Sequence, residues 1–230
     1  SSAMTIRIVL ADDQALIRAG FAALIGSAED MVVVGEAVDG QAAVERAKEL
    51  HPNVILMDIR MPGTDGLSAT EAITSDPTLS DVRILVLTTF EADEYVLSAI
   101  RAGASGFLGK GVEPDDFLAA IRVVANGDAL LSPVATKALI GRYLSAPELG
   151  APNSVAGNFA VLTDRERELV AFAAQGWSNE QIATNLVVSP LTVKTHINRA
   201  MTKLGARDRA QLVVMAYQAG LVRVGPVQSA

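Results

Sequence analysis

Two hydrophobic patterns alternate along the first half of the chain. Apolar residues recur every three or four positions in some stretches, as at Leu16, Ala19 and Ala23, which predicts helices. Between these stretches lie short apolar runs that indicate buried strands: Ile6–Ala11, Met31–Ala37, Asn53–Asp58, Arg83–Thr88 and Ala104–Lys110. Near-continuous apolar strands separated by helices are typical of a parallel sheet covered on both faces. The pattern predicts a doubly wound α/β domain with a five-stranded parallel sheet over residues 5–127.

The second half has helical patterns only. The segment "SPVATKALIGRYL" predicts a helix with Pro133 in its first turn, and Ser145–Asn158 is predicted to be a linker within a connecting region at 128–160. Four short helices are expected over residues 161–224, with a tight turn between the second and third. Their capping signals are the capping-box pairs Thr163/Glu166 and Ser178/Gln181, the N-caps Ser189 and Asp208, and the terminating Gly176 and Gly205.

Charge separates the two halves. Residues 1–130 hold 9 Lys and Arg against 20 Asp and Glu, whereas residues 131–230 hold 10 against 6. A mildly basic second half suggests a polyanionic partner. The chain has no cysteine, which excludes disulfides and zinc–thiolate sites. No apolar run approaches the roughly 20 residues that a membrane-spanning helix needs. We therefore expect a cytoplasmic protein without a membrane segment.

The expected strands end in residues that carry chemistry. Asp12 and Asp13 follow the first strand, and Asp58, Thr88 and Lys110 end the third, fourth and fifth. Ligands of open parallel sheets bind beyond the carboxyl ends of the strands, where the strand order reverses. The sequence therefore predicts that three carboxylates, a hydroxyl and an ammonium converge there.

Such a group of residues suits a hard divalent cation. Carboxylates and water are the ligands that Mg²⁺ prefers, with phosphate oxygens completing its coordination. A carboxylate beside the metal can act as a nucleophile and form an acyl phosphate. The simpler interpretation of any one of these residues is a helix N-cap, and Asp13 in particular fits that interpretation. Five residues in matching positions favour the metal site.

The segment "VILMDIRMPGTDG" around Asp58, with the other strand-end residues, resembles the receiver domain of two-component response regulators over about residues 5–127. The resemblance implies a flavodoxin-like fold in which a sensor histidine kinase phosphorylates Asp58. It also implies roles for the surrounding residues. Mg²⁺ would be held by Asp12, Asp13, Asp58 and the backbone carbonyl of Arg60, the phosphoryl group would be engaged by Thr88 and Lys110, and Phe107 would be the switch aromatic.

The third helix expected in the second half, Ser189–Leu204, has two faces. The apolar residues fall on one stripe, which predicts a core face: Val193, Ile197, Ala200, Met201 and Leu204. The opposite face is polar, carries positive charge and has no carboxylate. A helix of this kind fits the major groove of DNA, although its composition alone favours a merely solvated surface.

The motifs "LTDRERE", "GWSNEQIA", "TVKTHI" and "KLGARDRAQLV" resemble the LuxR-type helix-turn-helix of the NarL/FixJ subfamily over about residues 160–222. The resemblance implies that Ser189–Leu204 is the recognition helix of a domain that binds double-stranded DNA. Lys194, Thr195 and Asn198 would then read bases, while Thr192, Arg199, Lys203 and Arg207 would contact phosphates.

These expectations combine into a DNA-binding response regulator rather than an enzyme. Phosphorylated Asp58 would draw Thr88 toward the phosphoryl group, Phe107 would rotate inward, and the surface of residues 92–127 would change shape. The expected outputs are promoter binding and homodimerisation. Two alternatives stay open: a phosphorylation-independent DNA-binding regulator, and a metal-dependent aspartyl phosphatase. Arg60 disfavours the phosphatase, because it stands where such an enzyme needs an acid to protonate the leaving group.

Overall fold

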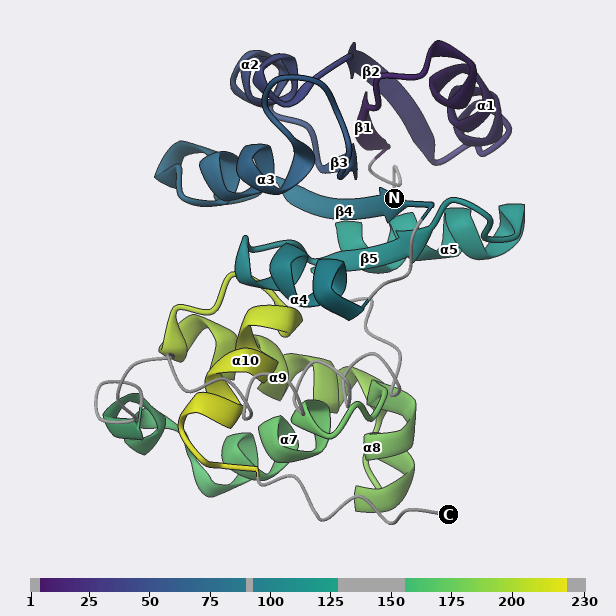
Figure 1. Cartoon of the computed structure of the whole chain (residues 1–230). Coiled ribbons are helices and arrows are strands. Elements are labelled where there is room, and N and C mark those ends of the chain that lie inside the picture. Colours follow the sequence, from purple (N-terminus) through teal and green to yellow (C-terminus); the bar gives the residue numbers. More distant parts are fainter. Residues whose placement is uncertain (1–4, 90–92, 128–155, 223–230) are drawn as a thin grey trace, which may run out of the picture. The chain divides into compact units, whose positions relative to one another are not determined.

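The computed structural model describes residues 5–89, 93–127 and 156–222 (Figure 1). The chain divides into two compact units, the first ending at Leu130 and the second beginning at Leu131. The helix predicted at "SPVATKALIGRYL" and most of the predicted linker lie outside the described residues. Within the described part of the chain, no helix has both the length and the apolar character needed to cross a membrane.

The first unit contains the predicted five-stranded parallel sheet, in the order β2-β1-β3-β4-β5. Because β1 pairs with β2 on one side and with β3 on the other, the strand order reverses beside β1. A crevice for ligands is expected at the carboxyl ends of β1 and β3. The strands are β1 (Ile6–Ala11), β2 (Met31–Ala37), β3 (Val54–Asp58), β4 (Arg83–Thr88) and β5 (Gly106–Gly109).

Two strands are shorter than the sequence predicts. Asn53 precedes β3 and pairs with Arg7 through its side chain, whose Oδ1 accepts the Arg7 N–H at 2.8 Å. Ala104 lies before the edge strand β5, because its N–H donates back to the carbonyl of Ala99 in the preceding helix at 2.9 Å. Lys110 follows β5 and still donates its N–H to the Thr88 carbonyl at 2.8 Å.

Helices cover both faces of the sheet, as predicted (Figure 1). Along β1, Ile8 and Leu10 pack into one core while Val9 and Ala11 pack into the other. This alternation buries both faces of the sheet at its centre, so β1, β3 and β4 are mainly apolar, whereas the edge strand β2 is only partly buried. The first core lies under α1 (Ala15–Gly26) and α5 (Pro114–Ala125); the second lies under α2 (Gly40–Leu50), α3 (Gly66–Thr74) and α4 (Asp93–Arg101).

In the second unit, residues 156–222 pack four helices around one apolar core, as predicted. Both predicted capping boxes are present, and Ser189 and Asp208 cap their helices. The last three residues of the predicted linker instead begin η2 (Ala156–Val161), because Phe159 of that segment is buried in the core. The helices are α7 (Asp164–Ala174), α8 (Asn179–Leu186), α9 (Pro190–Leu204) and α10 (Arg209–Gln218).

Candidate functional site

Three carboxylates meet at the carboxyl ends of β1 and β3. Asp12, Asp13 and Asp58 each place one carboxylate oxygen within 4.8 Å of the others. We call these three residues the acidic cluster. Asp12 and Asp58 are 5% and 6% exposed, whereas Asp13 is open to solvent. The strands that carry them are direct neighbours, so the parallel pairing of β1 with β3 brings the acids together.

Asp13 is not the helix cap that the simpler interpretation required. Gln14 is the N-cap residue of α1, and its side chain makes no capping hydrogen bond. The Gln14 N–H instead donates to Oδ1 of Asp12 at 2.8 Å. Helix capping therefore does not account for the Asp13 carboxylate, which leaves it available as a ligand.

Lys110 brings one positive charge to the acidic cluster. Its Nζ lies 2.5 Å from Oδ2 of Asp12 and 3.2 Å from Oδ1 of Asp58, and its side chain is buried. β5 ends at Gly109, and parallel pairing with β4 sets Lys110 at the same edge of the sheet as the acids. One ammonium faces three carboxylates, so the cluster as a whole remains negative.

The charge imbalance is visible in the pKa of Asp58. Burial raises the pKa of this carboxyl, and the negative charges of Asp12 and Asp13 raise it further, while Lys110 opposes them and does not prevail. A second cation would relieve this repulsion. The oxygen-only ligands and the excess negative charge therefore fit a hard divalent cation such as Mg²⁺.

The other predicted receiver residues lie on β4, on β5 and just after β3. Thr88 ends β4 and is 3% exposed, at the same edge of the sheet. Phe107 lies on β5 opposite Val86 and is half-buried against the core under α2, α3 and α4. Arg60 is exposed two residues beyond Asp58 and donates through Nη2 to the Tyr95 hydroxyl of α4 at 3.0 Å.

Close backbone packing holds the loop that follows Asp58. A Cβ added to Gly66 would lie 1.9 Å from the carbonyl oxygen of Asp58, closer than any real side chain allows. The Gly66 N–H donates to the Ile59 carbonyl at 2.9 Å, and Asp65 caps the helix that begins there. Glycine is thus required at this position to keep α3 against β3.

Arg18 supports the position of Asp12, a role that the sequence pattern does not predict. Its Nη1 donates to the Asp12 carbonyl at 2.7 Å and its Nε to the Glu36 carboxylate at 2.8 Å. These contacts fix the turn that carries Asp12 against α1 and β2. The signal available in the sequence was that Arg18 is the only charged residue within α1.

α9 presents the two faces that its sequence predicts. Val193, Ile197 and Ala200 are at most 2% exposed, and Leu204 is 6% exposed. Of the seven predicted DNA contacts, two are half-buried and five are exposed. The half-buried residues are Lys194 and Arg207; the exposed ones are Thr192, Thr195, Asn198, Arg199 and Lys203.

Lys203 already has a partner inside the second unit. Its Nζ donates to Oε2 of Glu166 at 2.7 Å. Glu166 is 3% exposed and also accepts the Thr163 N–H at 2.9 Å as part of the capping box of α7. The charge of Lys203 is therefore partly committed to the fold, which weakens its expected contact with a phosphate.

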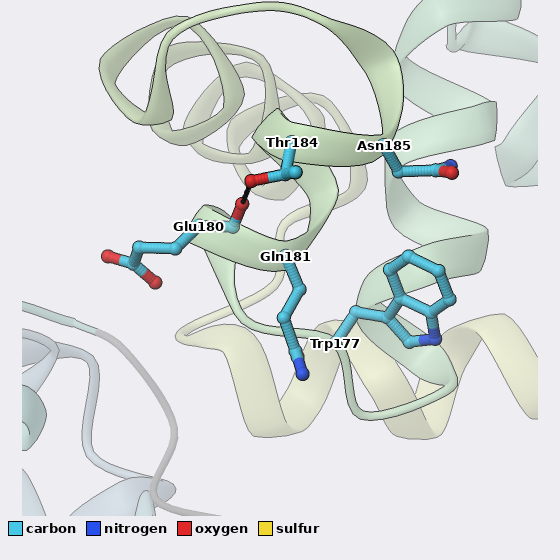
Figure 2. Close-up of a pocket in the computed structure, with 5 residues that line it drawn as sticks. All are labelled: Trp177, Glu180, Gln181, Thr184 and Asn185. Atoms are coloured by element: carbon cyan, nitrogen blue, oxygen red, sulfur yellow. Dashed lines mark hydrogen bonds between the residues drawn. The ribbon is translucent and has the colours of Figure 1, made fainter.

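A separate pocket of about 470 Å³ lies over α8, lined by Trp177, Glu180, Gln181, Thr184 and Asn185 (Figure 2). The Thr184 hydroxyl donates to the Glu180 carbonyl within the helix at 2.9 Å, and the Glu180 carboxylate points away from Trp177. Hydrogen bonds from its own N–H and from Ser178 lower the pKa of Glu180. The lining of this pocket lacks the converging carboxylates that define the acidic cluster.

Comparison with known proteins finds relatives of both units. Residues 8–122 match the response regulator receiver domain, and residues 160–216 match the bacterial regulatory proteins of the luxR family. An uncharacterized transcriptional regulatory protein of Bacillus subtilis, YxjL, is 42% identical over 95% of this chain and 98% of its own. The response regulator VraR of Staphylococcus aureus is 33% identical over 96% of this chain and 100% of its own.

A solved structure is similar to part of the chain. The LuxR-family two-component response regulator from Aurantimonas sp. SI85-9A1 is 31% identical and has a TM-score of 0.55. The similarity covers 61% of this chain and 99% of that one. YxjL is described as a transcriptional regulatory protein and VraR as a response regulator, in agreement with the expectation that this chain is a regulator rather than an enzyme.

Proposed function

The chain belongs to the two-component response regulators that join a receiver domain to a LuxR-family DNA-binding domain, and from this premise we propose that Asp58 is its phosphoacceptor. A sensor histidine kinase is the proposed donor. The observation that carries the proposal is the acidic cluster, in which a buried Asp58 shares one lysine with Asp12. Asp58 is the member that ends a central strand, next to the loop held by Gly66.

The proposed reaction is a transfer of the phosphoryl group between two side chains. An Asp58 oxygen attacks the phosphorus of the donor phosphohistidine, the P–N bond breaks, and its electron pair stays with the imidazole nitrogen. Lys110 Nζ, already 3.2 Å from Asp58, donates to the transferred oxygens, and the Thr88 hydroxyl does so from the neighbouring strand. The product is an acyl phosphate on Asp58.

Mg²⁺ is the proposed cofactor. Asp12, Asp13, Asp58 and the backbone carbonyl of Arg60 would hold it. When bound, it supplies positive charge against the phosphoryl oxygens and the carboxylates. Arg18 fixes the backbone of Asp12 through its 2.7 Å hydrogen bond and so keeps one ligand of this set in place.

Phosphorylation is proposed to switch the output of the protein. The added charge at Asp58 draws Thr88 inward, Phe107 rotates into the space that Thr88 leaves, and the surface of residues 92–127 changes shape. We expect this surface change to promote homodimerisation. A dimer would place two copies of α9 on DNA half-sites about one helical turn apart.

α9 is proposed to enter the major groove of promoter DNA. Its polar face carries Lys194, Thr195 and Asn198 for the bases, with Thr192 and Arg199 beside them for phosphates. Arg207, just beyond the helix, is a further proposed phosphate contact. Lys203 is also a proposed phosphate contact, and this contact would compete with its hydrogen bond to Glu166.

Labelling with acetyl phosphate tests the phosphoacceptor. Asp58→Asn should abolish incorporation in the presence of Mg²⁺, measured by intact-protein mass spectrometry. Asp65→Asn is the matched control, since it makes the same change on the same loop and asparagine can still cap α3. Full incorporation in Asp58→Asn would show that another residue accepts the group.

Operator binding tests the DNA interface. Lys194→Ala should weaken binding by about 1–3 kcal/mol if the lysine reads a base. Lys48→Ala, which removes the same charge from α2, should leave affinity unchanged. An unchanged affinity and an unchanged salt dependence in Lys194→Ala would remove this residue from the interface.

Size-exclusion chromatography with beryllofluoride and Mg²⁺ tests dimerisation. An unaltered oligomeric state would favour a phosphorylation-independent regulator.

A further inference from the structure

Leu191 is an unusually exposed apolar residue on α9. It is the second residue of the helix and 72% exposed. The core residues Val193 and Ile197 of the same helix are at most 2% exposed, and at 3.6 residues per turn they lie on the opposite side. Packing among residues 156–222, the described part of the second unit, therefore gives no reason for a leucine at this position.

The surroundings of Leu191 are the polar residues of the proposed DNA interface. Lys194, Thr195 and Asn198 follow it by three, four and seven positions, so all four side chains share one stripe. The Thr195 hydroxyl donates back to the Leu191 carbonyl at 2.9 Å, which occupies its hydrogen atom within the helix. The stripe thus combines the polar side chains of Lys194 and Asn198 with one apolar side chain at its amino-terminal end.

We propose that Leu191 reads the C5-methyl group of a thymine in the major groove. This inference rests on the proposed role of α9 as the recognition helix. The amino-terminal turn of such a helix approaches the base edges, and the thymine methyl is the apolar feature that the major groove displays. Ser189 caps the helix and Pro190 occupies its first turn, so the backbone that carries Leu191 is held in one conformation.

Replacement of thymine by deoxyuridine isolates this contact, because the two bases differ only by the methyl group. A duplex site is first selected from a randomised library with the full chain in beryllofluoride and Mg²⁺. Each thymine of the site is then replaced singly by deoxyuridine, and affinity is measured for wild type, Leu191→Ala and Val161→Ala. Val161 is a matched control, an apolar residue of the same unit that is 54% exposed and lies outside α9.

Wild type and Val161→Ala should both lose affinity about fourfold at one deoxyuridine position, the effect of one methyl group left in water. Leu191→Ala should bind the unmodified site about as weakly as wild type binds the site with that deoxyuridine. Introducing the same deoxyuridine should not lower the affinity of Leu191→Ala any further. An equal deoxyuridine effect in wild type and Leu191→Ala would overturn the inference, as would the lack of any effect in wild type. In both of those cases the proposed interface survives if Lys194→Ala still weakens binding. Failure to select any site would reject the interface and the inference together.

Discussion

A buried carboxylate meets a lysine in each unit, and the two pairs differ in the balance of charge. In the first unit, Lys110 contacts Asp58 and Asp12, and Asp13 stands beside them. In the second unit, Lys203 contacts Glu166 at 2.7 Å. Both carboxylates are at most 6% exposed, so burial alone does not distinguish a binding site from a structural ion pair.

The pKa directions separate the two pairs. Burial raises the pKa of Asp58, and the neighbouring acids add to that effect. Burial also acts to raise the pKa of Glu166, but hydrogen bonds from Lys203 and the Thr163 N–H outweigh it and lower the pKa. Glu166 is thus stabilised as an ion by the folded protein, while burial and the neighbouring acids disfavour ionised Asp58. A buried acid whose ionisation the fold disfavours distinguishes the candidate site from the structural ion pair.

Magnesium provides the largest test of this difference. At 100 times its dissociation constant, Mg²⁺ should stabilise the first unit by about 2.7 kcal/mol, because it is proposed to bind the folded acidic cluster and not the unfolded chain. The second unit should not respond. Trp177, the single tryptophan of the sequence, reports unfolding of the second unit by fluorescence, while circular dichroism follows both units.

Asp13→Asn is the control for the magnesium effect. It removes one proposed ligand from an exposed position and should abolish most of the stabilisation. Sodium chloride at matched ionic strength separates specific binding from screening. A magnesium response of equal size in both units would mean that the acidic cluster is no more a cation site than the Glu166–Lys203 pair.

Removal of the buried charge should have opposite effects in the two units. Glu166→Gln should lower the free energy of unfolding by about 2 kcal/mol, because hydrogen bonds to a charged group are lost. Asp58→Asn should raise the free energy of unfolding at pH 7 without Mg²⁺, since its raised pKa means that ionisation opposes folding. Denaturant titration of each variant measures both changes. A loss of stability in Asp58→Asn would contradict the charge imbalance.

Much of the site was predictable because strand ends in a parallel sheet share one edge. Asp58, Thr88 and Lys110 each end or follow a strand, so their convergence required only the correct strands. The caps Thr163 and Ser178 were equally predictable, because a capping box is decided within four residues.

The contacts that sequence reasoning missed join segments far apart in the chain. Arg18 binds the carboxylate of Glu36, eighteen residues away, and nothing local selects that partner. The family resemblance implies a phosphate contact for Lys203, whereas the partner that the structure gives it, Glu166, lies 37 residues earlier. The need for glycine at Gly66 likewise arises only from the close approach of α3 to the Asp58 carbonyl.

Lysine removal gives a smaller test, and it also bears on DNA binding. Lys203→Met should lower the free energy of unfolding by about 1 kcal/mol, less than Glu166→Gln. The Lys203 side chain is 38% exposed, so water can partly replace the ammonium group beside Glu166. Lys110→Met should destabilise the first unit, and Mg²⁺ should restore part of that loss. If Lys203→Met also reduces the salt dependence of operator binding, the lysine contacts a phosphate when DNA is present.

Acid titration should produce the smallest stability changes, and it tests the Asp58 and Glu166 carboxylates most specifically. The pKa of Glu166 is lowered from about 4.5, so its stabilisation is fully present above that pH and is lost as the pH falls through the folded-state value. The stability difference between wild type and Glu166→Gln should therefore shrink below pH 4.5, followed by Trp177 fluorescence. For Asp58 the folded pKa lies above the ordinary 3.8, so the gain from Asp58→Asn should begin to shrink at a higher pH than 3.8. Differences that stay constant with pH in both units would show that the two carboxylates act through shape rather than charge.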